Sequence, residues 1–134
     1  MKWIWALCAW LLVGPFAAAE VIPVQLDRKG VKSPDQVVYG VDAASGKVVW
    51  ERRFPQEANF AKAVNGGILV GCDDGAVYLL APADGAVLWS AQVGEKDEKV
   101  NGFHGTHANG WLVSYHDNVY WLVSPKGSLV WTLR

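Results

Sequence analysis

The residues best suited to metal chemistry are three histidines in the last third of the chain. His104 and His107 lie three residues apart, and His116 with Asp117 follows nine residues later. Imidazole and carboxylate groups are common zinc ligands, so this set could hold a metal ion. In an extended strand, however, positions 104 and 107 point to opposite faces. Unrelated imidazoles in a polar loop and at a strand edge explain the pattern more simply, and we expect no metal site.

Candidates for nucleophilic or acid–base catalysis are equally incomplete. Ser114 and His116 share one face of a predicted strand, but the sequence offers no orienting acid or oxyanion hole to complete a triad. Asp73 and Asp74 come directly before Gly75, which is typical of a hairpin turn rather than of a carboxylate pair. The sequence contains no Gly-x-Ser-x-Gly motif and no phosphate-binding loop. We therefore expect no catalytic residues and no enzymatic activity.

Three aromatic residues form a separate candidate site. Trp111, Tyr115 and Trp121 lie close together in the sequence. An exposed aromatic surface of this kind could bind a peptide, a sugar or a protein partner. The alternative is that the same side chains pack in the core. We keep Trp111, Tyr115 and Trp121 as a candidate partner surface.

The elements that position these residues are indicated by an internal repeat. A tryptophan recurs at intervals of 39 and 42 residues, each time four residues after a glycine. The three copies are Gly46-Lys47-Val48-Val49-Trp50, Gly85-Ala86-Val87-Leu88-Trp89 and Gly127-Ser128-Leu129-Val130-Trp131. A period near 40 residues is typical of a small sheet repeated in series, as in the blades of a β-propeller. The repeat predicts that these glycines and tryptophans are structural residues.

Turn residues predict four strands in each complete repeat. Asn65-Gly66, Asp74-Gly75 and Asp84-Gly85 separate apolar runs, and residue types of this kind favour tight hairpins. We therefore expect an all-β fold, a partial propeller of about three antiparallel four-stranded blades with the first incomplete. The predicted blades cover about residues 20–57, 58–98 and 99–134. The predicted strands are 37–42 and 47–54 in the first blade, 58–64, 67–72, 76–81 and 86–93 in the second, and 99–107, 110–115, 118–123 and 128–133 in the third.

The opening segment 21–26 is ambiguous. It could be the inner strand of the first blade, or it could complete another blade, as closing strands do in many propellers. Pro23 favours an edge position because proline lacks the N–H that a central strand would use.

The repeated pattern resembles the quinoprotein (pyrroloquinoline-quinone-type, PQQ-type) β-propeller family. The segment 41–50, with Gly46 and Trp50, is most similar to the repeat of that family, and the resemblance extends over about residues 37–134. It implies that Trp50, Trp89 and Trp131 dock one blade onto the next, and that Gly46, Gly85 and Gly127 permit the tight turn before the outer strand.

The chain also departs from this family. Family propellers have seven or eight blades, whereas this sequence supports three at most. It could be a remnant of a longer protein, a chain that closes by self-association (for example two copies in a six-bladed ring), or an open stack with polar outer faces. The apolar segment 130–133 argues against a well-capped free edge.

The family's dehydrogenases bind a quinone and calcium at the ring centre. The sequence has no adjacent cysteine pair and no acid cluster suited to calcium. We therefore expect no cofactor.

The N-terminal segment 1–19 has the features of a secretory signal peptide. Lys2 precedes an apolar run, and Ala17-Ala18-Ala19 supplies small residues for cleavage. The alternative is an uncleaved anchor, but the run is short for a span of about 20 residues. Cleavage would remove Cys8 and leave Cys72 as the single cysteine, so no intrachain disulfide is expected.

The formal net charge of −1 comes from scattered residues, so nothing indicates a nucleic-acid surface or a membrane-binding patch. Taken together, these features predict an exported protein, periplasmic or extracellular, without a membrane span after cleavage. The resemblance implies a non-enzymatic binding or scaffold module that contacts a protein partner or another copy of itself. The alternative is a remnant or subunit of a PQQ-dependent dehydrogenase-like enzyme.

Overall fold

The computed structural model describes residues 20–134, so the predicted signal peptide and Cys8 lie outside the described residues. Within this described part of the chain, eleven strands form three antiparallel sheets, which confirms the all-β prediction. The first sheet has the order β1-β2-β3, the second β4-β5-β6-β7 and the third β8-β9-β10-β11. The strands are β1 (Val21–Val24), β2 (Val37–Asp42), β3 (Val48–Arg53), β4 (Ala58–Val64), β5 (Gly67–Cys72), β6 (Ala76–Leu80), β7 (Val87–Gln92), β8 (Gly102–His107), β9 (Gly110–Tyr115), β10 (Val119–Val123) and β11 (Leu129–Leu133).

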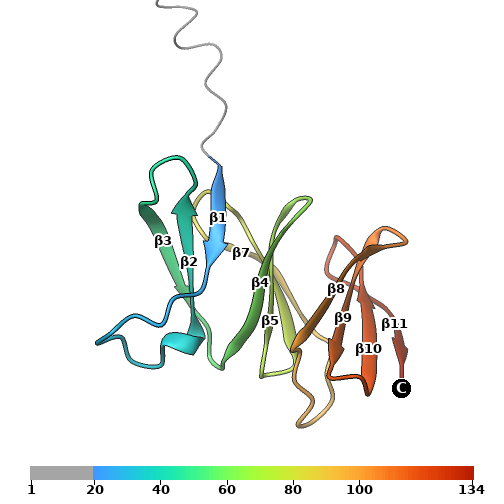
Figure 1. The fold of residues 1–134 in the computed structure, drawn as a ribbon. Coiled ribbons are helices and arrows are strands. Elements are labelled where there is room, and N and C mark those ends of the chain that lie inside the picture. The colour runs from blue at the N-terminus through green and yellow to red at the C-terminus, as the bar shows by residue number, and fades with distance from the viewer. Residues whose placement is uncertain (1–19) are drawn as a thin grey trace, which may run out of the picture.

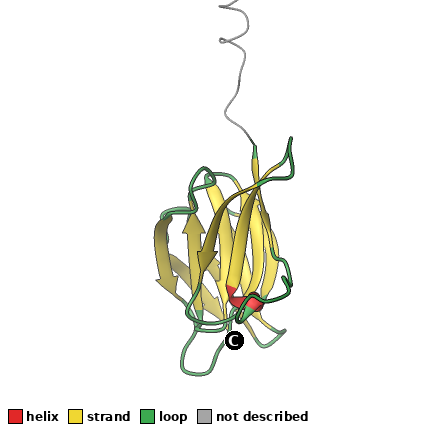
Figure 2. Cartoon of the chain, turned by 90° about the vertical axis from the view of Figure 1, so that its left-hand side faces the viewer, coloured by secondary structure: helices red, strands yellow, loops and turns green. Residues whose placement is uncertain are grey.

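The three sheets stand side by side in the order of the sequence (Figure 1). The view turned by 90° shows that the strand axes of the three sheets are roughly aligned (Figure 2). Each sheet is a meander in which successive strands pair, and the connections inside a sheet are short hairpin turns except for the long polar segment between β1 and β2. This arrangement follows from the regular spacing of turn residues between short apolar runs. Within residues 20–134 no helix is long and apolar enough to cross a bilayer.

Two apolar clusters join the sheets. Val38, Trp50, Ile68 and Leu80 belong to the cluster between the first and second sheets. The cluster between the second and third sheets is larger; its buried members are Phe60, Leu69, Val77, Leu79, Val93, Val100, Trp111, Val113, Val119, Trp121 and Val123. Strand β5 is buried along its whole length, because it is the second strand of the middle sheet and faces a neighbour on both sides. Strands that are buried on both faces are typically continuous apolar runs, as β5 is.

The outermost hairpin of each sheet has the same irregularity. The ladder between β2 and β3 shifts register at Gly40/Val41, that between β6 and β7 at Leu79/Leu80, and that between β10 and β11 at Leu122/Val123. A bulge of this kind bends the outer strand and increases its twist. Each repeated tryptophan is paired directly before the shift, opposite Gly40, Leu79 or Leu122. All three indoles are therefore attached to the same local backbone geometry.

The opening segment belongs to the first sheet. It corresponds to the second strand of each of the other two sheets, not to their first strand. Val24 of β1 pairs with Tyr39 in the same way that Val70 of β5 pairs with Tyr78. Strand β1 therefore takes the second position, and the described part of the first sheet has no equivalent of β4 or β8. The prediction that Pro23 lies in an edge strand is confirmed, because β1 has a partner on one side only.

A polar connection covers part of the outer face of the first sheet. It contains the short 3-10 turn η1 (Pro34–Gln36), drawn red in Figure 2. The guanidinium of Arg28 lies 5.3 Å from the centre of the Tyr39 ring, and Tyr39 is fully buried. The Nε2 of Gln25 donates a hydrogen bond to the Ala58 carbonyl at 2.6 Å, which ties the start of this connection to β4.

Candidate functional site

The histidines of the third sheet do not converge. His104 Nε2 lies 2.8 Å from Ser114 Oγ, and His107 Nε2 lies 2.8 Å from the backbone carbonyl of His104. His116 is instead near Asn101, with 3.4 Å between His116 Nδ1 and Asn101 Nδ2. Among residues 20–134, no group of three His, Cys, Asp or Glu side chains is placed to hold a metal ion.

A pairing that sequence reasoning missed is the one between Ser114 and His104. The sequence suggests Ser114 with His116, which are close along the chain, whereas the structure brings β8 and β9 together and places His104 beside the hydroxyl. Ser114 is only 1% exposed, and the His104 ring packs against Tyr120 at 5.3 Å between ring centres. A buried hydroxyl with an imidazole partner satisfies its own polarity, and no carboxylate of the described chain orients the ring as a triad requires.

The first repeated tryptophan joins the first sheet to the second. Trp50 projects from β3 onto the turn between β6 and β7, and its Nε1 donates a hydrogen bond to the Pro82 carbonyl at 2.7 Å. Gly85 lies directly under the indole, because a Cβ built there would be 2.5 Å from Cε3 of Trp50. Arg52 Nε donates a second bond to the Gly85 carbonyl at 2.8 Å. Only a glycine leaves room for this contact, and its φ of 73° suits the left-handed region.

The second repeated tryptophan makes the same joint one sheet further along. Trp89 Nε1 donates to the Pro125 carbonyl at 3.0 Å, and a Cβ built on Gly127 would lie 2.6 Å from Cδ2 of Trp89. The indole also stacks on Trp111 of β9, with 6.3 Å between ring centres and 28° between planes. Two neighbouring pairs of sheets are thus connected by an indole of one sheet seated on the glycine turn of the next.

The third repeated tryptophan is in a different environment. Trp131 of β11 is 44% exposed, whereas Trp50 is 8% exposed. At the opposite flank of the stack, the turn that contains Gly46 has no indole on it, and a Cβ built there would meet no atom within 4 Å. The six repeat residues therefore form two complete joints, Trp50 with Gly85 and Trp89 with Gly127, while Trp131 and Gly46 lie at the two outer flanks.

The candidate partner surface at Trp111, Tyr115 and Trp121 needs correction. Trp111 is 2% exposed and Trp121 is 0% exposed, because both point into the cluster between the second and third sheets. Tyr115 is partly buried against the same cluster. The alternative of core packing describes the two tryptophans, and they present no surface to a partner. Alternation places Trp111, Val113, Val119, Trp121 and Val123 on one face of the paired strands β9 and β10, but it does not indicate that this is the covered face.

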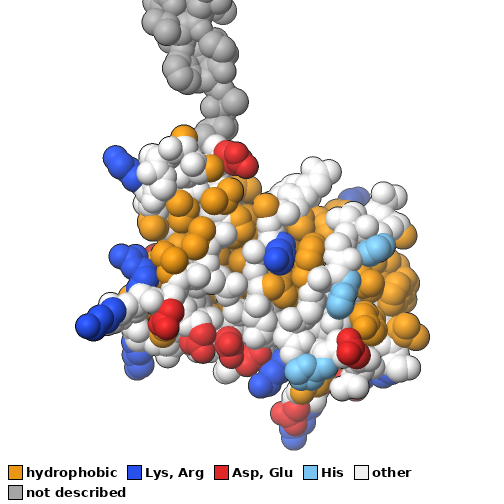
Figure 3. Space-filling model, viewed as in Figure 1, with side chains coloured by type: hydrophobic (Ala, Val, Ile, Leu, Met, Phe, Trp, Pro, Cys, Tyr) orange, Lys and Arg blue, Asp and Glu red, His pale blue; other side chains and the backbone are white. Residues whose placement is uncertain are grey.

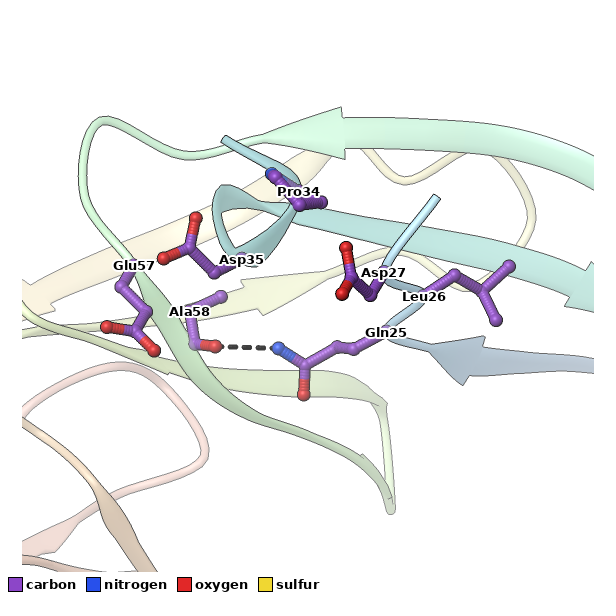
Figure 4. Close-up of a pocket in the computed structure, with 7 residues that line it drawn as sticks. All are labelled: Gln25, Leu26, Asp27, Pro34, Asp35, Glu57 and Ala58. Carbon is purple, nitrogen blue, oxygen red and sulfur yellow. Dashed lines mark hydrogen bonds between the residues drawn. The ribbon is translucent and has the colours of Figure 1, made fainter. Parts of the chain in front are cut away.

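A shallow cleft lies beside the connection that follows β1. Its volume is about 500 Å³, and Figure 4 shows that Gln25, Leu26, Asp27, Pro34, Asp35, Glu57 and Ala58 line it. Three of these residues carry carboxylates and none carries a positive charge. Acidic side chains alone do not define a ligand site, so we assign no function to this cleft.

Two ionisable groups near the first joint have shifted pKa values. Burial raises the pKa of the Cys72 thiol far above its ordinary range, and the nearby carboxylates of Asp74 and Asp73 raise it further. Burial, followed by the hydrogen bond that the phenol donates to Asp74, raises the pKa of Tyr78. A thiol that resists ionisation is a poor nucleophile, so Cys72 is a packing residue.

Exposed apolar side chains gather on the outermost strands. Of the ten large hydrophobic residues that are exposed between residues 20 and 134, eight lie on β3, β7 or β11: Val48, Val49, Val87, Leu88, Leu129, Val130, Trp131 and Leu133. The remaining two, Ile22 and Leu26, are in or after β1. Figure 3 shows hydrophobic atoms gathered over the end of the stack that carries β11. Apolar residues on strand edges favour contact with another protein.

Three stacked antiparallel sheets with a repeated joint between neighbours define the class of β-propeller repeat proteins. The chain belongs to the PQQ-type propeller-repeat family whose model is described as outer membrane protein assembly factor BamB, and that model matches residues 9–134. The resemblance inferred from the Gly-Trp repeat is therefore confirmed. No curated protein matches the sequence significantly.

Solved structures share the fold at low sequence identity. BamB from Moraxella catarrhalis is 19% identical with a TM-score of 0.64, and the match covers 87% of this chain and 34% of that one. A europium-containing methanol dehydrogenase is 16% identical with a TM-score of 0.61, covering 87% and 23% of the two chains. BBS1N in complex with ARL6DN is 16% identical with a TM-score of 0.54, covering 74% and 33%. The chain thus spans about a third or less of each of these proteins.

Proposed function

We propose that this protein is a non-enzymatic, exported scaffold that binds protein partners through the outermost strands of its sheets. The observation that carries the proposal is the concentration of exposed apolar side chains on β3, β7 and β11. The same pair of positions before each tryptophan is apolar and exposed in all three sheets. A surface repeated at regular intervals suits a protein that contacts an extended or multi-part partner.

Two further observations support a scaffold over an enzyme. The matched family model is described as a protein assembly factor. Within residues 20–134, Ser114 is buried and its pair with His104 has no orienting acid, and the cleft beside the connection after β1 holds only carboxylates among its charged groups. Protein binding requires neither a nucleophile nor a cofactor.

Site-specific photo-crosslinking in cells that export the protein tests this proposal. A photoreactive amino acid is placed at Leu88, which is 54% exposed on β7, and the matched control is placed at Lys62, which is exposed on β4. We expect discrete crosslinked bands containing another protein at position 88 and none at position 62. Absence of crosslinks at 88, together with oxidation of an alcohol by the purified protein supplied with PQQ and calcium, would refute the scaffold function.

A further inference from the structure

We propose that a second copy of this chain docks head to tail on the stack, with the Trp131 indole of one copy seated on the Gly46 turn of the other. The inference deepens the proposed function, on which it rests, by naming a partner for the two flanks of the stack. It is argued from the two joints inside the chain, which show what each half of such a contact requires.

The Gly46 turn has the backbone of a turn that already accepts an indole. Gly46 and Gly85 both have φ of 73°. The Gly46 N–H donates to the Asp42 carbonyl at 2.8 Å, and the Gly85 N–H donates to the Ala81 carbonyl at the same distance. Ala43 therefore takes the place of Pro82, the residue whose carbonyl accepts the Trp50 bond. The turn presents a carbonyl and a glycine surface in the arrangement that the first joint uses.

The side chains below the turn correspond as well. In the second sheet, Ile68 and Leu80 face each other across β5 and β6, and both are buried in the cluster that contains Trp50. In the first sheet, the corresponding pair is Ile22 and Val41. Ile22 is 36% exposed, whereas Ile68 is 1% exposed. The first sheet thus carries an apolar floor of the right chemistry, and an indole laid across it would bury it.

The donor half lies on the opposite flank. Trp131 pairs with Leu122 directly before a register shift, as Trp89 pairs with Leu79. The side chain is therefore presented as Trp89 is, with its face directed away from the second sheet. Leu133 lies two residues further along β11 on the same face and is 60% exposed. A flank with an exposed indole and leucine matches a flank with an open glycine turn and an exposed isoleucine.

The contact joins two different surfaces, so it is heterologous. Such contacts form rings when the rotation closes and open chains when it does not. Two copies would contribute six blades, which is within the range of about 4–8 blades found in closed propellers. Each joint in the ring would then be of the Trp-on-turn type.

The experiment is sedimentation of the purified protein, of two flank variants and of two matched controls. We expect the wild type to associate with increasing concentration, and both Trp131→Ala and Gly46→Ala to remain single chains. The matched controls are Thr132→Ala, which truncates an exposed side chain on the other face of β11, and Gly66→Ala, which alters an open glycine with φ of 98° in the hairpin between β4 and β5. Both controls should associate like the wild type.

A mixture of the two variants that do not self-associate distinguishes this head-to-tail contact from a symmetric one. Trp131→Ala retains an intact Gly46 turn and Gly46→Ala retains an intact Trp131, so the mixture should form a heterodimer with one joint. Association of Gly46→Ala alone would overturn the proposal, as would a mixture that stays dissociated or a wild type that remains a single chain up to its solubility limit. If the wild type is a single chain but position 88 still crosslinks to another protein, the scaffold function stands and the self-contact falls.

Discussion

Replacing Trp50 by alanine should destabilise the fold far more than replacing Trp131. Both indoles extend from outer strands at the same register shift, so they differ mainly in what covers them. Trp50 is 8% exposed and Trp131 is 44% exposed. For a tryptophan that buries about 200 Å², this difference corresponds to about 70 Å², or about 2 kcal/mol at 25 cal/mol per Å². Loss of the hydrogen bond to the Pro82 carbonyl adds about 1 kcal/mol.

The expected difference in the free energy of unfolding is therefore about 3 kcal/mol, within the range measured for deletion of large buried aromatic side chains. Urea unfolding followed by circular dichroism measures it. With a slope of about 2 kcal/mol per molar urea, the midpoint of Trp50→Ala should lie about 1.5 M below that of Trp131→Ala. Low protein concentration keeps association from stabilising either variant. Equal midpoints for the two variants would refute the docking role assigned to the repeated indole.

Three other measurements test separate parts of the structure. Gly85→Ala should destabilise more than Gly46→Ala, because both place a side chain at φ of 73° but only the first also displaces an indole; equal urea midpoints would contradict this. Cys72 should resist alkylation at pH 8 in the folded protein and react after unfolding, since burial keeps its thiol protonated; rapid labelling of the folded Cys72 peptide in a mass map would be the contrary result. Because the pKa of Tyr78 is raised in the folded protein, the contribution of Tyr78 to stability is present below the unfolded pKa of about 10 and is lost as the pH rises above that value. Tyr78→Phe should therefore reduce the fall in the free energy of unfolding at alkaline pH. An unchanged fall in the variant would contradict the raised pKa.

Much of the fold could be predicted because its signals are local. The strands at 58–64, 67–72 and 110–115 match the predicted ranges, since Asn-Gly and Asp-Gly turns mark their ends and apolar runs fill their interiors. The spacing of the glycines and tryptophans indicated a repeated sheet, and the resemblance to the quinoprotein family implied that each sheet is joined to the next. These features depend on residues that are neighbours in sequence or recur at a fixed period.

What could not be predicted depends on pairing between distant segments. The position of β1 is set by hydrogen bonding to β2 across a long polar connection, and no turn residue marks that register. The contact between His104 and Ser114 similarly requires the alignment of β8 with β9, which includes a bulge between Phe103 and Thr106. The burial of Trp121 is fixed by the neighbouring sheet rather than by its own strand. A period of two assigns a side chain to a face, but it does not say which face is covered.

The proline in β1 affects whether a further strand can pair with the free edge of the first sheet. The Ala43 N–H bonds the Glu20 carbonyl, so by the alternation of an antiparallel ladder the main-chain groups of Val21 and Pro23 point away from β2. A strand arriving along that edge would find a carbonyl at position 23 but no donor beside it. Lengthening of the first sheet by strand addition at its β1 edge is therefore impeded, whereas the β3 edge, on the opposite side of the sheet, is not affected.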